Sequence, residues 1–309
     1  MENIKACNNF WFCDVYHKQK VKDFKKTNLC RDKFCSNCKK VIQAGRMAKY
    51  IPEIEKHKGY VYHLTLTAPR VSGHCLYDRV RYMAKCFRKL YQYVSGQKKI
   101  KGLDFSFWNC IGGLRSLEIT VDSDFHPHYH CLLLLPGFVM GEKNVVNDYS
   151  YSYGKLQNRF SREEIYIQKI WYLLINGEKV TLQNICELQQ GYSCKMDKLK
   201  EGDYNEIFKY ITKEVREDGK VITYENFRVL YQALFRLKQI QGYGVLYSVG
   251  DDPDLESIIE QYQIMVDLLR EAEEPKESVG YTVSALLHDE KYLLVSRKSY
   301  MKYFRDIEG

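Results

Sequence analysis

The chain has 309 residues, enough for one large or two smaller folded domains, and its 45% hydrophobic and 14% aromatic content excludes a disordered protein. No apolar run approaches the roughly 20 residues that span a bilayer, and the N-terminus is not a signal peptide, so we expect a cytoplasmic protein without membrane contact. The net charge of +8 is unevenly spread. Residues 1–100 carry 22 Lys and Arg against 7 Asp and Glu (about +15), which leaves 25 against 32 (−7) for the remainder. This asymmetry favours nucleic-acid binding over a merely solvated basic surface.

Residues 1–58 combine many lysines with cysteines spaced as metal ligands. The odd total of 11 cysteines, without a secretion signal, favours reduced thiols over disulfides. Cys35 and Cys38 have the spacing of a zinc knuckle, and tetrahedral zinc needs four ligands. The expected ligands are Cys13, Cys30, Cys35 and Cys38. Cys7 and His17 are alternatives to Cys13, and a redox Cys-x-x-Cys pair is the competing interpretation.

A strand and a helix follow this module. Residues 60–67 are rich in β-branched and aromatic side chains and end at Ala68-Pro69, which predicts a strand. The periodicity of residues 78–95 predicts an amphipathic helix. Its apolar stripe consists of Val80, Met83, Ala84, Phe87, Tyr91 and Val94. Its basic residues lie largely off that stripe and are Arg79, Arg81, Lys85, Arg88 and Lys89.

The stretch 115–135 reads as two strands joined by a polar turn at 122–125. Side chains two apart in a strand share a face, so His126, His128 and His130 project together. If the hairpin turns about position 124, Glu118 lies opposite His130 and on the same face. Two imidazoles and a carboxylate in this arrangement predict a facial divalent-metal site with open positions. A hydrogen-bonded histidine cluster without metal is the alternative.

Further elements follow from periodicity and capping signals. Ser161 and Glu164 form a capping box that opens a helix at 161–176. The remaining expectations are a loop at 137–160, a strand at 180–194, a helix at 225–239, a strand at 243–249, an acidic helix from 252 to about 273 and a terminal hairpin of 281–287 with 292–296. No phosphate-binding G-x-x-x-x-G-K-[ST] motif is present, so we expect no ATP-driven helicase in this chain and infer a helicase partner.

Residues 203–217 predict a helix with a polar stripe opposite its apolar one. Glu206 and Tyr210 are neighbours on that stripe, at i and i+4, and Lys213 lies beside them. A tyrosine off the core stripe and next to a carboxylate is a candidate nucleophile. On its own, such a pair is more often an ordinary surface feature, because the chain has 26 tyrosines.

In this order, the features resemble the rolling-circle replication initiators of small bacterial plasmids, which are HUH endonucleases. The resemblance covers roughly residues 10–250 and is carried by five segments, 30–38, 62–69, 117–120, 126–133 and 206–213. It implies an α+β fold with an antiparallel RRM-like sheet and an N-terminal zinc module. The implied domains are a zinc module at 1–58, an endonuclease core at 59–220 and an acidic extension at 221–309.

The resemblance also implies a mechanism and partners. Glu118, His128 and His130 would hold Mg²⁺ or Mn²⁺, with His126 outside the ligand set, and structural Zn²⁺ would occupy the cysteine cluster. Tyr210 would nick DNA through a 5′-phosphotyrosine link, steadied by Lys213, and Glu206 would activate water at termination. The implied partners are the double-strand origin of a plasmid, a single-stranded hairpin at the nick site, and a bacterial host's helicase and DNA polymerase. A relaxase, a transposase or a non-catalytic zinc-dependent DNA-binding regulator are the alternatives.

Overall fold

The computed structural model of the 309-residue chain has two compact units, residues 1–45 with 252–309, and residues 46–251. The residues that the structure describes are 7, 10–16, 21–27, 30, 32, 34–35, 38, 46, 49–103, 105, 108–146, 159–189, 191–200, 216–217, 220–249, 278–282 and 293–295. The second unit runs to residue 251, so the segment 221–251 belongs with the main sheet and not with a C-terminal extension. Among the described residues, no helix is both long and apolar enough to cross a bilayer.

The first unit joins strands from both ends of the chain. Strands β1 (Phe10–Tyr16) and β2 (Val21–Thr27) pair antiparallel. Strand β12 (Ser278–Thr282) lies antiparallel to β1, and β13 (Leu293–Val295) lies parallel to β2. The sheet order is therefore β12-β1-β2-β13. The predicted hairpin of 281–287 with 292–296 is wrong, because these strands lie at opposite edges and each pairs with an N-terminal strand.

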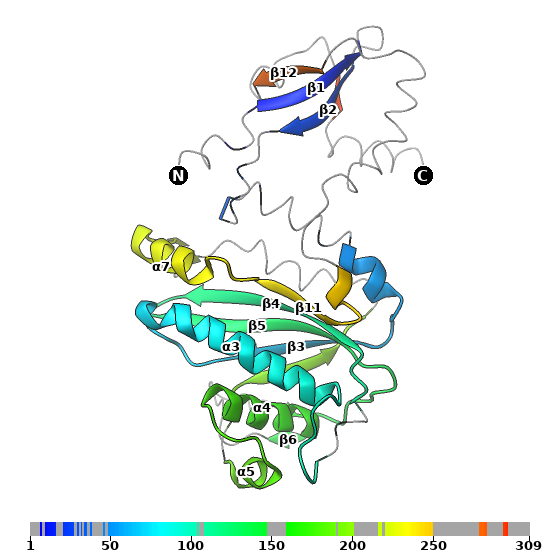
Figure 1. Cartoon of the computed structure of the whole chain (residues 1–309), viewed down its shortest axis with the longest axis vertical. Helices are drawn as coiled ribbons and strands as arrows, with labels where there is room; N and C mark the ends of the chain where they lie inside the picture. The colour runs from blue at the N-terminus through cyan, green and yellow to red at the C-terminus, as the bar shows by residue number, and fades with distance from the viewer. Residues whose placement is uncertain are drawn as a thin grey trace. The chain divides into compact units, whose positions relative to one another are not determined.

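The second unit is built on an antiparallel sheet (Figure 1). Its long strands are β3 (Val61–Thr67), β4 (Gly112–Val121), β5 (Phe125–Leu134), β8 (Cys194–Lys198) and β11 (Ile240–Gly244). They are ordered β11-β4-β5-β3-β8, all antiparallel, and the short strands β9 (Arg216–Glu217) and β10 (Lys220–Val221) extend the sheet beyond β4. The fold is α+β, as predicted.

Helices α3 (Gly73–Val94) and α4 (Arg162–Ile175) lie in front of the sheet in Figure 1 and cover one of its faces. The predicted stripe of α3 is buried, except that Ala84 is only partly so, and the helix begins five residues earlier than expected. The ring of Phe87 packs on that of Tyr129 of β5, with the two ring centroids 5.7 Å apart. On α4, Trp171 Nε1 donates to the carbonyl of Thr67 at 2.6 Å, which fixes the helix to the end of β3.

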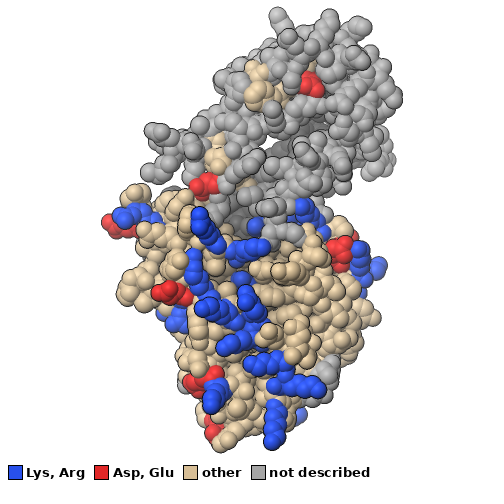
Figure 2. Space-filling model, viewed as in Figure 1, with Lys and Arg blue, Asp and Glu red and all other residues tan. Residues whose placement is uncertain are grey.

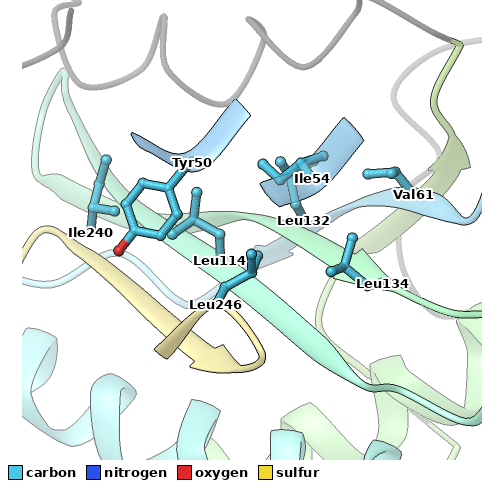
Figure 3. Close-up of a cluster of buried hydrophobic side chains, with 8 residues drawn as sticks. All are labelled: Tyr50, Ile54, Val61, Leu114, Leu132, Leu134, Ile240 and Leu246. Carbon is cyan, nitrogen blue, oxygen red and sulfur yellow. The ribbon is translucent and has the colours of Figure 1, made fainter. Parts of the chain in front are cut away.

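The opposite face carries a second apolar cluster at one end of the sheet (Figure 3). Tyr50 and Ile54, from the helical segment 49–55, pack there on strand residues. The strand residues and their neighbours in this cluster are Val61, Leu114, Leu132, Leu134, Ile240 and Leu246. Because Leu132 and Leu134 share a face with His128 and His130, the segment 49–55 covers one end of the histidine face and not the other.

Several predicted boundaries are wrong. The strand predicted at 180–194 is instead helix α5 (Leu182–Glu187), because the Thr181 side chain accepts a hydrogen bond from the Asn184 N–H and caps a helical turn. The edge strand is β8, further along. The predicted strand at 243–249 is shifted to β11, with a 3₁₀ turn at Tyr247–Val249. Helix α7 (Tyr224–Leu234) ends sooner than predicted.

Other predictions meet short strands or undescribed residues. The predicted loop 137–160 contains the paired strands β6 (Val145–Val146) and β7 (Arg159–Phe160). Of the helix predicted at 203–217, the two final residues form β9 and the rest lies outside the described residues, as does the predicted acidic helix at 252–273.

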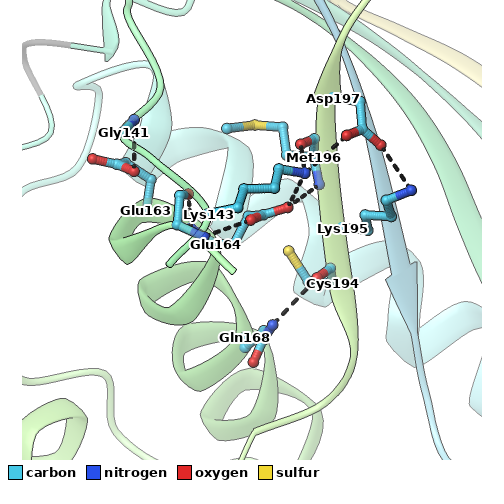
Figure 4. A network of polar contacts seen from close by, with 10 residues as sticks. Gly141, Lys143, Glu163, Glu164, Gln168, Cys194, Lys195, Met196 and Asp197 are labelled. Atoms are coloured by element: carbon cyan, nitrogen blue, oxygen red, sulfur yellow. Dashed lines mark hydrogen bonds and ion pairs between the residues drawn. The ribbon is translucent and has the colours of Figure 1, made fainter. Parts of the chain in front are cut away.

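A buried carboxylate joins α4 to the edge strand β8 (Figure 4). The predicted capping box is present: the Glu164 side chain accepts from the Ser161 N–H at 2.7 Å. The same carboxylate accepts from the Met196 N–H at 2.7 Å and from Lys143 Nζ at 3.0 Å. Burial alone would lower the pKa of Lys143, but its hydrogen bonds to Asp197 and Glu164 outweigh burial and raise it.

We expect Glu164→Gln to lower the free energy of unfolding by about 2 kcal/mol, because a neutral amide leaves buried donors without their charged acceptor. Urea unfolding followed by tryptophan fluorescence measures this change, since Trp108 and Trp171 are buried in this unit. Glu163→Gln, one residue away and only half-buried, is the control, with an expected effect under about 0.5 kcal/mol. Equal losses in the two variants would show that the network contributes nothing specific.

Candidate metal centres

The hairpin of β4 and β5 brings the predicted ligands together. Glu118 lies directly opposite His128, and Ser116 lies opposite His130. The hairpin therefore turns about Ser123, one position earlier than predicted, and the register differs by two residues. The Asp122 carboxylate holds this turn: it accepts from the Asp124 N–H at 3.3 Å and pairs with Arg70 at 2.6 Å. A shift of two residues keeps every side chain on its face, so the predicted convergence survives the change of register.

Three ligand atoms of this site lie within 4.8 Å of one another. Oε2 of Glu118 is 2.6 Å from Nε2 of His128 and 3.0 Å from Nε2 of His130. The side chains are largely buried, with Glu118 7% and His130 6% exposed. Two imidazole nitrogens and one carboxylate oxygen thus point at one place, which is a donor set that Mn²⁺ accepts and that leaves positions open for phosphate oxygens.

Each imidazole is held by a contact on its other nitrogen. Nδ1 of His128 donates to the backbone carbonyl of His126 at 3.2 Å. Because a carbonyl only accepts, the proton of the neutral ring sits on Nδ1, and Nε2 presents its lone pair toward Glu118. Nδ1 of His130 lies 3.2 Å from Nε2 of His63, and the two rings are stacked with centroids 5.4 Å apart. These contacts orient both rings as outer partners orient metal-binding histidines.

Sequence reasoning missed His63. It lies on β3, opposite Leu132 of β5, and reaches the diagonal neighbour His130. The sequence shows a histidine in a strand but not that β3 pairs with β5, so the contact becomes visible only in the sheet.

His126 lies on the same face and outside the ligand set. Its ring centroid is 5.7 Å from that of His128. Burial, with smaller contributions from His128 and Arg70, lowers the pKa of His126.

A second group of potential ligands lies in the first unit. The sulfur atoms of Cys7, Cys30, Cys35 and Cys38 all lie within 4.8 Å of one another. Sγ of Cys38 is 3.6 Å from Sγ of Cys7 and 3.7 Å from Sγ of Cys30. A tetrahedron with Zn–S bonds of about 2.3 Å has edges of roughly 3.8 Å, so these separations fit zinc. All 11 cysteines are free of disulfides.

The structure groups Cys7, one of the two alternatives, and not Cys13 with the other three cysteines. Cys13 lies in the middle of β1, opposite Phe24 and Val279, and belongs to neither group of potential ligands among the described residues. Strand pairing holds Cys13 in the sheet, whereas Cys7, three residues before β1, packs on Cys35 and Cys38. His17, the other alternative, lies outside the described residues.

The predicted nucleophile site cannot be placed beside these ligands. Tyr210, Glu206 and Lys213 all lie outside the described residues. Their roles remain predictions.

Comparison with known proteins shows similarity to replication proteins over part of the chain. A family model described as a replication protein matches residues 21–151. The chain is 30% identical to a protein rep from Lentilactobacillus hilgardii, over 41% of this chain and 40% of that protein. It is 31% identical to a protein rep from Staphylococcus aureus, over 43% of this chain and 57% of that protein. It is 32% identical to a protein rep from Bacillus amyloliquefaciens, over 34% of this chain and 30% of that protein. The chain thus spans about half the length, or less, of these relatives.

No solved structure matches the chain. The family match includes Glu118, His128 and His130 and ends before Tyr210. The matched segment and the curated relatives show that this part of the chain is similar to Rep replication proteins.

Proposed function

We propose that this protein initiates rolling-circle replication of a bacterial plasmid by nicking one DNA strand at the origin. The observation that carries the proposal is the convergence of Glu118, His128 and His130 within a segment matched by a replication protein family. A carboxylate and two imidazoles that converge at one point suit a divalent ion that binds a scissile phosphate.

The fold supports this proposal. The chain order β3-α3-β4-β5-α4-β8, with the sheet order β4-β5-β3-β8, is the split β-α-β arrangement of ferredoxin-like and RRM-like domains. Helices α3 and α4 cover one face of the sheet, and the three candidate ligands lie on the other, where DNA would bind. This is the architecture expected of an HUH endonuclease.

In the proposed reaction, the phenolate oxygen of Tyr210 attacks the scissile phosphorus. A P–O bond to the tyrosine forms, the bond to the 3′ oxygen breaks, and the released 3′-OH primes synthesis. Mg²⁺ or Mn²⁺ held by Glu118, His128 and His130 would polarise the phosphate and offset its developing charge. A phenol has a pKa near 10, so Tyr210 must give up its proton as it attacks, and Lys213 would steady the phenolate.

The covalent link conserves the phosphodiester energy for strand transfer. At termination Glu206, four residues before Tyr210 in the sequence, would take a proton from water. The cysteine cluster would hold structural zinc close to the basic residues of the first unit. A host helicase would then separate the strands, and a host DNA polymerase would extend the primer.

Tyr210→Phe should abolish the covalent adduct between protein and DNA, because the attacking oxygen is removed. The assay incubates the full chain with Mn²⁺ and single-stranded origin DNA and detects a denaturant-resistant complex on a gel. Tyr204→Phe, on the apolar stripe of the same predicted helix, is the control and should keep the adduct. An adduct that persists in Tyr210→Phe would refute the nucleophile assignment, and its absence in every variant would favour a non-catalytic DNA-binding regulator.

His63→Ala should weaken Mn²⁺ binding by about 10-fold to 100-fold, because His130 loses the contact that orients its ring. His126→Ala, which removes a histidine of the same face outside the ligand set, should leave the affinity within about twofold. Mn²⁺ titration monitored by electron paramagnetic resonance measures binding without any DNA reaction. Similar affinities for the wild type and His63→Ala would contradict the orienting role.

Cys7→Ser should remove bound zinc, because a serine hydroxyl is a poor substitute for a thiolate ligand. Cys13→Ser is the matched control and should retain one zinc per chain. Elemental analysis of both purified variants measures the difference. Zinc retained in Cys7→Ser and lost in Cys13→Ser would restore Cys13 as the fourth ligand.

A further inference from the structure

The exposed side of α3 is strongly basic. Residues 73–101 contain eight Lys and Arg (79, 81, 85, 88, 89, 98, 99 and 101) against one acidic residue, Asp78. Figure 2 shows basic side chains gathered in a band on the face of the molecule where α3 lies in front of the sheet. We define the α3 basic band as Lys85, Arg88, Lys89, Lys98, Lys99 and Lys101, all of which are exposed.

The band is continuous from the helix into the following loop. Lys85 shares a helix face with Arg88 and Lys89, at i+3 and i+4. The loop after α3 folds back on the helix, because the backbone N–H of Lys98 donates a hydrogen bond to the carbonyl of Gln92 at 2.8 Å. The three loop lysines then line a cavity of about 520 Å³ together with Tyr93 and Phe105, and no acidic residue lines it.

The cations of the band have no carboxylate partner among the described residues. The ion pairs of the second unit involve other cations, namely Lys56, Arg70, Lys143 and Lys195. Arg81 is left out of the band because its guanidinium donates to the carbonyls of Ala233 and Phe235. Like charges at i, i+3 and i, i+4 weaken a helix, so a run of them without counter-charges suits an external polyanion.

The band and the metal centre lie on opposite faces of the sheet. Phe87 on the buried side of α3 contacts Tyr129, whose side chain alternates with those of His128 and His130 along β5. A strand held at the metal centre therefore cannot reach the band without passing around the sheet.

We infer that the α3 basic band binds the phosphate backbone of duplex DNA. Single-strand sites combine cations with exposed aromatic rings on which bases stack. The exposed large apolar residues of α3 are Tyr77 and Tyr82, and among the described residues none lies between 83 and 105. Cations along a straight helix, spaced about 4.5 to 6 Å along its axis, suit the closely spaced phosphates of a duplex. The inference rests on the proposed function only in that the protein acts on DNA.

The test compares the salt dependence of duplex binding in three full-length proteins. The band variant changes Lys85, Arg88 and Lys89 to Gln. The control variant changes Lys56, Lys58 and Lys198 to Gln, which alters the net charge equally at exposed lysines outside α3 and its following loop. The probe is a fluorescent 20-base-pair duplex of random sequence, followed by anisotropy from 50 to 200 mM salt.

We expect the band variant to lose about 0.9 in the slope of log K against log salt for each phosphate contact removed, or up to roughly 3 in total. The control should keep the wild-type slope within about 0.5. Equal slopes in the two variants would overturn the inference. A single-stranded probe of the same length that lost as much affinity as the duplex would also overturn it, since the band would then not distinguish a duplex.

Adduct formation on a short single-stranded origin oligonucleotide separates the two proposals. The band variant should form the covalent adduct at the wild-type rate, because the band lies away from the metal centre. If no protein forms the adduct but the band variant still loses its salt slope, the nicking proposal fails and the duplex-binding inference stands. If the adduct forms normally and the slope does not change, only the inference fails.

Discussion

Ten register pairs join β4 to β5, and the alternation of side chains along these two strands sets the chemistry of both faces of the sheet. On one face, Glu118 meets His128 and His130 at hydrogen-bonding distance. On the other, Tyr129 and Cys131 are fully buried beneath the helices. A slip of one residue would exchange the two faces, moving the ligands beneath the apolar helix layer and Tyr129 and Cys131 to the other side of the sheet. The cost of burying those polar groups keeps the register in place.

This arrangement gives the ligands a rigid support. Beyond the ligand pair, the apolar cluster around Leu132 and Leu134 closes the end of the sheet, and His63 and the His126 carbonyl hold the outer nitrogens of the two rings. Little side-chain freedom remains to be lost on binding an ion, because the rings already point their Nε2 atoms at the carboxylate. The geometry favours an ion that accepts mixed nitrogen and oxygen ligands and keeps open positions.

The helix face is organised by different interactions. Arg115 of β4 is buried there, 4% exposed, with its Nε donating to the Tyr243 hydroxyl at 2.9 Å and its guanidinium 4.8 Å from the centroid of the Tyr129 ring. The aromatic rings of β5, α3 and β11 thus surround one cation in the core. Outside this layer α3 presents the basic band. The candidate metal ligands and the basic band thus lie on opposite sides of the sheet, which would suit the two proposed contacts with DNA.

The two proposed metal sites differ in how they are assembled. Glu118, His128 and His130 come from one hairpin of local sequence, so their convergence follows from short-range pairing. In the cysteine cluster, by contrast, Cys7 lies beside Cys30, Cys35 and Cys38, which are more than 20 residues away in the sequence. Its unit is closed by strands from residues 278–282 and 293–295, which pair with β1 and β2. Folding of this unit therefore requires both ends of the chain.

The sequence by itself determined the local features. The period of two in the hairpin predicted which of its residues share a face, the apolar stripe predicted α3, and Ser161 with Glu164 predicted the start of α4, because each signal depends on residues close together in the chain. Only the tertiary structure decided which strands pair. It placed His63 beside His130, grouped Cys7 with Cys30, Cys35 and Cys38, and joined β12 to β1. These outcomes depend on contacts between segments distant in sequence. Local periodicity does not show which of the possible pairings of such segments has the lowest free energy.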